Sequence, residues 1–537
     1  MSNQTVDGGL GELVDEAGCA HWPARLNLAE YFVDEPTRRY GADRPALLTA
    51  AGKLSYGELE SRSRRVASGL RELGVRPEER VVLALPDGFE FAEAFFGILR
   101  AGAVFAMLNP LLKADAFQGS LRYTKARVAF VHASVLEAFE SAFEQVAGCL
   151  ELIVVGGDAG RFTAYEDWLA AQNPGSSRAE TEPTGPDDLA GWLFTSGSTG
   201  TPKACVHTQS DFVFSTETYA RRIVGYGPEE VTLGVPKLFF GYATGTNLMF
   251  PLRFGGKAVL FPERSTAEAL FDLAEQFSPT LLTSVPTMIG QMLQSERLSA
   301  DGLGSLRVVL SAGEALPAPL YSAWKARTGV EILDGIGSAE MFHIYISNRF
   351  DDVKLGSLGK LVPGYEAQIL DPDGCELPDG QPGRLRIGGE STALCYWANR
   401  RASRETFAGR WCTSADVFVR DEQGYFTYQG RSDDLMKVSG IWVSPLEIEG
   451  ALLGHDDVAE VCVVPKEDES GLVKPLAFVV PASGRTGDTA LAEALKAHLK
   501  AKLAPHKYPR WFEWRAELPK NDRGKVARRV LAEEISR

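Results

Sequence analysis

The sequence predicts an α/β fold with a large N-terminal domain of covered parallel sheets plus a small antiparallel unit, followed by a small α+β C-terminal domain. Up to about residue 335, short runs that are apolar throughout alternate with amphipathic stretches. Strands of that kind, with helices between them, are typical of parallel sheets that are covered on both faces. From about Val353 the pattern changes to short strands separated by Gly, Pro and Asp turns, which predicts the antiparallel unit.

The first predicted helix begins at a capping box formed by Ser55 and Glu58, and it ends at Gly74. Asp87 stands before the next amphipathic stretch, which extends to about Arg100, and we expect Asp87 to cap that helix. The apolar runs that predict strands are 81–85, 103–108, 128–132, 152–155, 231–236, 258–261, 281–285, 307–311 and 330–333.

The last part of the chain has the pattern of a separate α+β domain, so we divide the chain into domains 1–430 and 431–537. The elements predicted in the second domain are strands at 459–464, 476–480 and 511–514 and a helix near 491–503. In the first domain, Gln172–Asp188 is rich in Pro, Gly, Ser, Thr and acidic residues and predicts an exposed loop.

The composition is that of a globular protein, with 45% apolar and 24% charged residues among 537. The 56 basic and 71 acidic residues give a net charge of −15. An acidic surface repels phosphate backbones, so we expect no nucleic-acid partner, although a local basic site for an anionic ligand remains open.

Cysteine usage and the termini bear on the compartment. The seven cysteines are scattered and form no C-x-x-C pair, which argues against a disulfide framework or a cysteine zinc site. Residues 1–18 carry acidic but no basic residues, unlike a signal peptide, and the uncharged run Gln276–Ser295 contains two prolines. We therefore expect a cytoplasmic protein with no membrane association.

The segment Phe194–Lys203 has the composition of a phosphate cradle. Its glycines let backbone N–H groups approach an anion, its hydroxyls add donors, and Lys203 supplies positive charge. A flexible Ser/Gly loop is the alternative interpretation, and a Walker loop is excluded because no Gly-Lys-Ser/Thr follows at the required spacing. The candidate phosphate-binding residues are Thr195, Ser196, Gly197, Ser198, Thr199, Gly200 and Lys203.

This segment resembles the phosphate-binding loop of the adenylate-forming superfamily, which contains acyl- and aryl-CoA ligases, peptide-synthetase adenylation domains and firefly-type luciferases. Five further motifs resemble those of the superfamily and follow in its order, over roughly 330 residues in all. They are Ser311–Glu314, Asp334–Glu340, Thr413–Asp416, Gly430–Asp434 and Pro519–Lys525.

Within the superfamily the chain is most similar to benzoate–CoA ligases, a group that includes the 2-aminobenzoate (anthranilate) ligases. The segments that carry this resemblance are Lys237–Tyr242, Asp334–Gly337, Met341–Ile344, Met436–Gly440 and Leu503–Arg510. The resemblance implies ATP, Mg²⁺ and coenzyme A as co-substrates or cofactors, a small aromatic carboxylic acid as substrate, and it allows a homodimer.

The resemblance also implies roles for individual residues. Lys525, Glu340 and Lys437 would be catalytic, with Glu340 holding Mg²⁺, Asp433 acting as the hinge of a mobile C-terminal lid and Gly440 lying on the CoA path. The nucleotide would contact Gly313, Glu314, Asp334, Gly335, Ile336, Asp416 and Arg431 in addition to the phosphate loop. The acid would contact Gly241, Tyr242, Ala243, Gly337 and His343.

Several alternatives stay open. His343 is as well explained as a core histidine as it is as part of the pocket wall. His207 is a weaker candidate for the site than His343. Ala204, Ala339 and Ala415 stand where members of the superfamily usually carry Gly, Thr and Gly, and the missing Thr hydroxyl predicts weaker pyrophosphate-side binding. An enzyme that loads an aryl group onto a carrier protein is the second interpretation, while a luciferase-like oxygenase and a non-enzymatic nucleotide switch have less support.

Gly241 bears on the substrate. Benzoate ligases commonly have Ala at this place, before the pocket tyrosine Tyr242, and a missing methyl group leaves room for one more heavy atom on the ring. We therefore expect 2-aminobenzoate to be accepted at least as well as benzoate. The competing interpretation is that Gly241 only permits a tight backbone turn.

Overall fold

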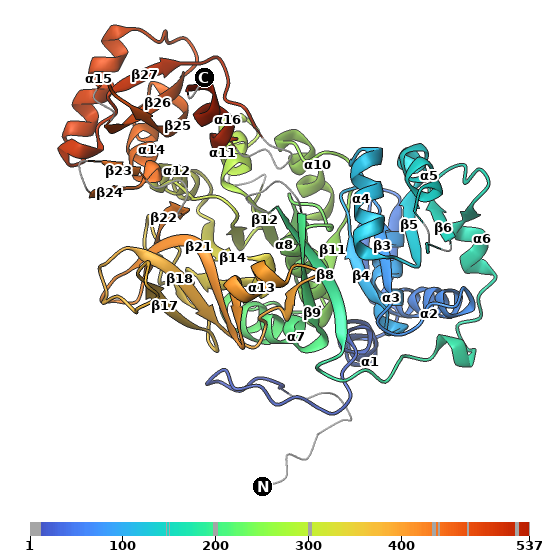
Figure 1. Cartoon of the computed structure of the whole chain (residues 1–537). Helices are drawn as coiled ribbons and strands as arrows, with labels where there is room; N and C mark the ends of the chain where they lie inside the picture. The colour runs from blue at the N-terminus through green and yellow to red at the C-terminus, as the bar shows by residue number, and fades with distance from the viewer. Residues whose placement is uncertain are drawn as a thin grey trace.

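The computed structural model describes residues 12–146, 148–149, 151–196, 202–298, 303–431, 436–438, 441–469, 472–520 and 526–535. Two large sheets with their helices and a third, antiparallel sheet form one large body, and the C-terminal elements lie beside it as a smaller unit (Figure 1). The α/β prediction is confirmed. The division at residue 430 itself stays a prediction.

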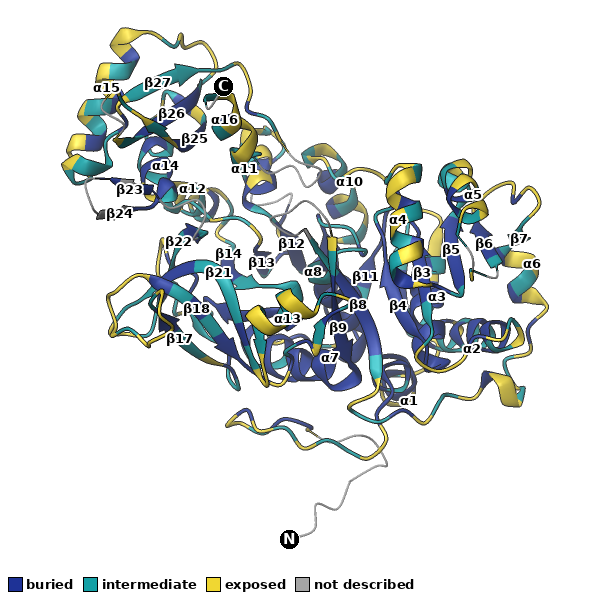
Figure 2. Ribbon diagram, in the orientation of Figure 1, coloured by how far each residue is buried: buried dark blue, intermediate teal, exposed yellow. Residues whose placement is uncertain are grey.

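The first sheet is parallel in its centre, where β3, β4, β5 and β6 pair in register. Val81–Ala84 and Val128–Val131 are buried throughout, as the apolar runs predict, because helices cover both faces (Figure 2). In spatial order its strands are β19 (Cys395–Tyr396), β9 (Pro202–Thr208), β8 (Leu189–Ser196), β4 (Val104–Met107), β3 (Arg80–Ala84), β5 (Val128–His132), β6 (Glu151–Val155) and β7 (Thr163–Ala164).

The second sheet is also parallel in its centre and ends in antiparallel edges. In spatial order its strands are β16 (Lys360–Leu361), β15 (Ile344–Ser347), β14 (Glu331–Gly337), β13 (Val308–Ser311), β12 (Leu281–Ser284), β10 (Val231–Gly234), β11 (Lys257–Val259), β1 (Pro45–Thr49) and β2 (Gly52–Ser55). Each apolar run predicted in this region lies on one of these strands.

The region after Val353 forms the predicted antiparallel sheet, and the C-terminal region forms a small α+β unit. The antiparallel sheet contains β17 (Glu366–Leu370), β18 (Gly383–Gly388), β20 (Phe407–Ala408), β21 (Trp411–Arg420) and β22 (Phe426–Arg431). The C-terminal strands are β23 (Met436–Val438), β24 (Ile441–Val443), β25 (Val458–Glu467), β26 (Val473–Pro481) and β27 (Trp511–Trp514).

The helices pack on the faces of these sheets (Figure 1). In the large body they are α1 (Glu35–Tyr40), α2 (Tyr56–Glu72), α3 (Phe89–Arg100), α4 (Ala114–Thr124), α5 (Leu136–Glu144), α6 (Tyr165–Ala170), α7 (Gln209–Ser215), α8 (Gly241–Thr244), α9 (Phe250–Arg253), α10 (Ala267–Phe277), α11 (Pro286–Gln294), α12 (Ala318–Thr328) and α13 (Arg400–Thr406). The C-terminal helices are α14 (Pro445–Leu453), α15 (Thr489–Lys500) and α16 (Arg528–Ile535). Glu30–Asp34, Thr216–Val224 and Gly245–Met249 are π-helical.

The capping box of α2 is present, since the Ser55 and Glu58 side chains each bond the backbone of the other residue. The expected cap of α3 is wrong. Gly88 is its N-cap residue, and Asp87 instead accepts a hydrogen bond from the N–H of Leu238, with Leu238 N 2.9 Å from Oδ1. Asp87 therefore bonds a residue that is distant in the sequence and does not cap α3.

Gln172–Asp188 is an irregular loop with one 3₁₀ turn, Ser177–Ala179, as the sequence predicts. It lies against the body rather than projecting, because Thr184 is 5% exposed and its hydroxyl donates to the carbonyl oxygen of Leu26 at 2.7 Å. None of the described helices combines the length and apolar character that crossing a bilayer requires.

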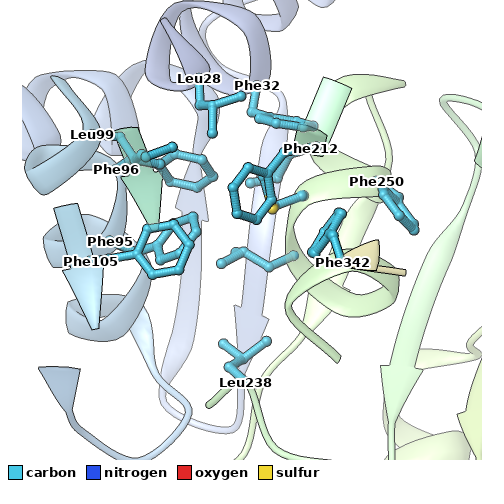
Figure 3. Packing of buried hydrophobic residues seen from close by; sticks show 14 of the residues in the cluster. Leu28, Phe32, Phe95, Phe96, Leu99, Phe105, Phe212, Leu238, Phe250 and Phe342 are labelled. Carbon is cyan, nitrogen blue, oxygen red and sulfur yellow. The ribbon is translucent and has the colours of Figure 1, made fainter. Parts of the chain in front are cut away.

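A continuous core joins the two large sheets (Figure 3). Phe95 and Phe105 of the first sheet region have ring centroids 4.6 Å apart, and Phe105 lies 5.6 Å from Phe212. Phe212 in turn lies 4.4 Å from Phe342, which precedes His343. These rings fill the space between the sheets, so the two halves of the large body share one apolar interior.

Candidate active site

Polar residues lie side by side at the carboxyl edge of the second sheet. Ser284, Ser311 and Asp334 are register partners on β12, β13 and β14, and all three are buried. The carboxyl edge of a parallel sheet is where α/β proteins bind ligands. Gly313 follows in this region with a φ of 88°, in the left-handed range that favours glycine.

Asp334 is the most perturbed acid of this edge. Burial raises its pKa to about 8, and nearby Ser311 and the backbone of Leu316 and Gly335 oppose that shift incompletely. Within the described residues, its Oδ1 has no hydrogen-bond partner. A buried carboxyl group with that pKa is largely protonated at neutral pH and can act as a hydrogen-bond donor.

The remaining candidate residues of this edge are Glu314, Gly335, Ile336 and Gly337. The carboxylate of Glu314 accepts hydrogen bonds from the N–H and hydroxyl of Thr287 at 3.2 and 2.7 Å, at the start of α11. A Cβ at Gly335 would lie 2.7 Å from the carbonyl oxygen of Ile346, and one at Gly337 would lie 2.5 Å from that of His343. The β14–β15 pair therefore requires glycine at both positions, on either side of Ile336.

The candidate phosphate loop connects two antiparallel strands. Thr195 pairs with Lys203, and Ser196 pairs with Pro202, at the open end of β8 and β9. Gly197, Ser198, Thr199 and Gly200 lie outside the described residues. The segment after the candidate loop is the strand β9, whereas a Walker loop leads into a helix.

Glu340 lies close to this hairpin. Its Oε1 accepts a hydrogen bond from the hydroxyl of Tyr396 at 2.7 Å, and its carbonyl oxygen accepts one from the N–H of Ala393 at 2.8 Å. The Nζ of Lys203 lies 5.0 Å from the centre of the Tyr396 ring. Tyr396 is not among the residues predicted from the sequence, since none of the motifs named above contains it.

His207 supports the same segment from the other side. Its Nε2 lies 2.7 Å from the carbonyl oxygen of Ala339, the residue before Glu340, and its Nδ1 lies 2.7 Å from Oδ2 of Asp211. Asp211 also accepts hydrogen bonds from the hydroxyl and N–H of Thr208 at 2.7 and 3.2 Å. A fully buried histidine thus ties the start of α7 to the backbone beside Glu340.

Tyr242 and His343 form a buried aromatic cluster. The His343 ring is 5.5 Å from the Tyr242 ring, 5.3 Å from Tyr219 and 4.6 Å from Phe250. Phe342 has a φ of 63°, which is strained for an aromatic residue and bends the chain immediately before His343. His343 is therefore both a buried residue and a neighbour of the predicted pocket tyrosine.

The protonation of His343 follows from its contacts. Its Nε2 lies 3.2 Å from the carbonyl oxygen of Tyr242, and because that oxygen only accepts, Nε2 carries the hydrogen. Burial lowers the pKa of His343 to about 3, so the ring is neutral and Nδ1 is an acceptor. In the described part of the chain, neither this Nδ1 nor the Tyr242 hydroxyl has a hydrogen-bond partner, although both atoms are buried.

Gly241 is the first residue of α8, and Ala243 is buried in the same helix. The backbone of Gly241 is not in the left-handed range, so an alanine could adopt its conformation. A Cβ there would meet Leu193 Cδ1 at 3.2 Å and the carbonyl oxygen of Phe342 at 3.7 Å. The missing side chain thus affects the space between α8, β8 and the segment before His343.

The segment before α8 is anchored through two adjacent residues, Lys237 and Leu238. Besides the bond from Leu238 to Asp87, the Nζ of Lys237 donates to the carbonyl oxygen of Phe261 at 2.8 Å. Burial raises the pKa of Asp87 to about 6 and lowers that of Lys237 to about 8, and each charge partly opposes the shift of the other. Near neutral pH the pair can hold opposite charges under the segment that leads to Gly241.

Asp416 and Arg431 come together on the antiparallel sheet. They are register partners on β21 and β22, and Tyr428 donates to Oδ1 of Asp416 at 3.4 Å. The Nε of Arg431 is buried and has no hydrogen-bond partner among the described residues. A shared ligand for the two side chains stays a prediction.

The C-terminal candidates are only partly described. Lys437 lies on β23, in a hairpin with β24, and Gly440 falls in its connection, outside the described residues. Asp433 and Lys525 also lie outside them. The segment that contains Lys525 is bracketed by an antiparallel bridge between Lys520 and Val526.

Comparison with known proteins agrees with this geometry. Residues 33–397 match the family described as AMP-binding enzyme, and residues 447–525 match the AMP-binding enzyme C-terminal domain. The chain is 43% identical to a benzoate–CoA ligase of Thauera aromatica, over 94% of this chain and 95% of the relative.

Two solved structures have the same fold over nearly their whole length. An anthranilate CoA ligase in complex with anthranoyl-AMP is 36% identical, with a TM-score of 0.90 over 96% of this chain and 98% of that one. A benzoate CoA ligase from Burkholderia xenovorans LB400 is 41% identical, with a TM-score of 0.86 over 94% and 99% of the two chains.

Proposed function

Because the chain belongs to the AMP-binding enzyme family, we propose that its active site joins benzoate or 2-aminobenzoate to coenzyme A through an aryl-AMP intermediate. The protein is an AMP-forming acid–CoA ligase of the aryl-CoA class, and ATP and CoA are its co-substrates. What we propose beyond this is the identity of the aromatic acid, the roles of the site residues and a rotation of the C-terminal unit.

The observation that carries the choice of acid is the buried aromatic cluster around His343. It lies beside β14, whose Asp334 is at the polar carboxyl edge of the same sheet. The side chains of Tyr219, Tyr242 and Phe250 suit a flat apolar ring, and among the described residues no cation contacts these rings to balance a second acidic group. An aromatic acid with one carboxylate is therefore the best match.

Two features favour an amino group next to the carboxylate. Gly241 lacks the methyl group that benzoate ligases commonly have, and its ordinary backbone conformation argues against a purely conformational role. The buried Nδ1 of His343 is an acceptor without a donor, and an aromatic amine would supply one. An ortho amino group can also bond internally to the carboxylate and reduce its desolvation cost.

The first half-reaction requires positive charge around the α-phosphate. The acid's carboxylate attacks the α-phosphorus of ATP, an aryl-AMP ester forms, and pyrophosphate leaves. Negative charge develops on the phosphoryl oxygens, so preorganised cations stabilise the transition state. We assign that role to Lys203 and Lys525, with Asp416 accepting hydrogen bonds from the ribose hydroxyls and Arg431 beside it.

The residues near the phosphate hairpin fit Mg²⁺. Glu340 presents a carboxylate oxygen besides the one bonded to Tyr396, and a hard cation of this kind prefers oxygen ligands. Glu340 would hold the ion together with the oxygens of ATP, since no cluster of three protein ligands occurs among the described residues. When bound, Mg²⁺ neutralises charge on the phosphates.

In the second half-reaction the CoA thiol attacks the carbonyl carbon of aryl-AMP, the thioester forms, and AMP leaves. Lys525 and Gly440 lie on different segments of one small unit, so we propose that the unit rotates about Asp433 between the half-reactions. The domain boundary at residues 430/431 and the role of Lys437 belong to this proposal.

The test is ATP–pyrophosphate exchange with benzoate, 2-aminobenzoate, hydroxybenzoates and short aliphatic acids. We expect exchange with the two proposed acids and little with the aliphatic acids. A second stage compares thioester formation on CoA with loading of a phosphopantetheinyl carrier protein. Pyrophosphate exchange with aliphatic acids alone would contradict the substrate assignment. Transfer of the aryl group to the carrier protein but not to CoA would show that the carrier protein is the acceptor.

A further inference from the structure

We propose that Tyr396 is a positioning residue that organises both charged groups of the ATP site. Its hydroxyl orients the carboxylate of Glu340, and its ring holds the ammonium group of Lys203. The inference rests on the proposed roles of Glu340 and Lys203, but not on the identity of the acid or of the acceptor.

Tyr396 lies between segments that are far apart in the sequence. It is on the short edge strand β19, where it pairs with Cys205 of β9, the strand that begins beside the phosphate loop. Glu340 comes from the turn after β14 in the other large sheet. The 2.7 Å hydrogen bond from Tyr396 to Oε1 of Glu340 is therefore a direct link between the two sheets at the site.

The side chain of Tyr396 is itself held in place. The residue is 6% exposed, and its ring centroid lies 5.0 Å from that of Phe407. The hydroxyl of Ser403 accepts from the N–H of Tyr396 at 3.0 Å and lies 3.2 Å from its carbonyl oxygen. A tyrosine fixed in this way can impose an orientation on Glu340, since its own rotamer is not free to follow the carboxylate.

The hydroxyl and the ring make separable contributions. The hydroxyl donates to one oxygen of Glu340, which directs the second oxygen toward other ligands and fixes the plane of the carboxylate. The ring faces Nζ of Lys203 at 5.0 Å, within the range of a cation–π contact. Lys203 forms no ion pair among the described residues, so the ring is the contact that restrains it near the phosphate hairpin.

Tyr396→Phe removes the hydroxyl and keeps the ring, and Tyr396→Leu removes both. Tyr123→Phe is a matched control, because the Tyr123 hydroxyl donates to the carbonyl oxygen of Trp397, the next residue, at 2.6 Å. Mn²⁺ serves as the metal probe, and its binding to the complex of enzyme and a non-hydrolysable ATP analogue is followed by electron paramagnetic resonance. Binding of the same analogue without metal and the thermal midpoint are measured in parallel.

We expect Tyr396→Phe to weaken Mn²⁺ binding about 5- to 10-fold, the size of an ordinary net hydrogen bond, and to leave metal-free analogue binding within about twofold. Tyr396→Leu should weaken metal-free binding about threefold or more in addition, because Lys203 loses the ring. If Tyr396→Leu does not fold, Tyr396→Met replaces it in the measurement of metal-free binding.

Unchanged Mn²⁺ affinity in Tyr396→Phe overturns the role of the hydroxyl, and equal metal-free affinities of the Phe and Leu variants overturn the role of the ring. A loss of Mn²⁺ affinity in Tyr123→Phe that matches the loss in Tyr396→Phe also overturns the proposal, because it indicates general disturbance of the segment. None of these measurements includes an aryl acid or CoA, so they stand apart from the test of the proposed function.

Discussion

Asp416 and Arg431 face each other as register partners on β21 and β22, at the end of the antiparallel sheet that leads into the C-terminal unit. The buried Nε of Arg431 has no hydrogen-bond partner among the described residues. Asp416 accepts a hydrogen bond from the hydroxyl of Tyr428. The pair therefore combines an acceptor with an unused donor, two residues before the proposed hinge at Asp433.

Asp416→Asn should weaken AMP binding about 10- to 100-fold, because a neutral amide replaces a charged acceptor of the ribose hydroxyls. Calorimetric titration with AMP measures this loss. The control ligand is 2′,3′-dideoxy-AMP, for which the variant and the unmodified enzyme should differ little. An equal loss with both nucleotides would argue against a ribose contact.

Lys525→Ala and Gly440→Leu should separate the two half-reactions. The lysine variant should lose aryl-AMP formation by two or more orders of magnitude and still convert supplied aryl-AMP to the thioester, since the proposed rotation moves Lys525 away from the α-phosphate before the second step. The leucine variant should retain pyrophosphate exchange and lose thioester formation, because its side chain obstructs the pantetheine path. Equal loss of both steps in both variants contradicts the rotation.

Gly241→Ala should lower kcat/KM for 2-aminobenzoate about 10- to 100-fold, or roughly 1–3 kcal/mol, by overpacking next to the ortho position. Benzoate should be nearly unaffected. The new Cβ would also lie 3.2 Å from Leu193, so Gly241→Ala combined with Leu193→Val is the control for that contact. If both acids lose equally in both variants, the substrate interpretation of Gly241 is wrong.

His343→Gln and His343→Asn test the acceptor. Glutamine keeps an amide N–H near the position of Nε2 and loses the acceptor, whereas asparagine keeps an acceptor near the position of Nδ1. The ratio of kcat/KM for 2-aminobenzoate to that for 2-methylbenzoate should fall about tenfold in the glutamine variant. The asparagine variant should keep more of this preference. Competitive kinetics with the two acids measure the ratio, and unchanged ratios would exclude a bond to the amino group.

Asp334→Asn should stabilise the protein in a pH-dependent manner. The pKa of about 8 in the folded state lies above the value of about 3.9 expected for an unfolded aspartate, so the folded state prefers the neutral form. The unmodified protein therefore loses stability as pH rises from about 4 to 8. The variant does not, so the difference should be near zero at pH 4.

Each pKa unit corresponds to about 1.4 kcal/mol, so the advantage of Asp334→Asn should grow to several kcal/mol above pH 8. Thermal unfolding across this pH range measures it. A constant difference at all pH values would indicate a packing effect instead. Nucleotide binding by the variant is a separate readout for the role of Asp334 at the sheet edge.

The parts of the fold that could be predicted are those in which neighbouring residues decide the structure. Ser55 and Glu58 satisfy each other within one turn of α2, and Val81–Ala84 is apolar because both of its faces are covered. Asp87 could not be predicted, since its partner Leu238 is 151 residues away. The sequence offers no local signal for a contact of that length.

The site residues that could be predicted are those that belong to spaced motifs. Lys203 and Glu340 belong to motifs in which several residue types occur at fixed spacing, so they were accessible from the sequence. Tyr396 contacts Glu340, and His207 contacts the carbonyl oxygen of Ala339, but neither residue belongs to a motif with a fixed spacing that could be detected in the sequence. The pairing of β19 with β9 brings Tyr396 to the site.

The hairpin of β8 and β9 has an electrostatic consequence. A phosphate loop that leads into a helix gains the partial positive charge of the helix N-terminus, but here the chain continues into β9, and α7 begins only after Thr208. At about 3.3 Å per residue, seven strand residues place that N-terminus more than 20 Å along the chain from the loop. Strands have little net dipole, so beyond the donors of the loop itself the attraction for the phosphates comes from full charges on side chains and bound cations. Such attraction is screened by dissolved ions, which makes the affinity for ATP a function of ionic strength to a degree that a loop backed by a helix dipole would not share.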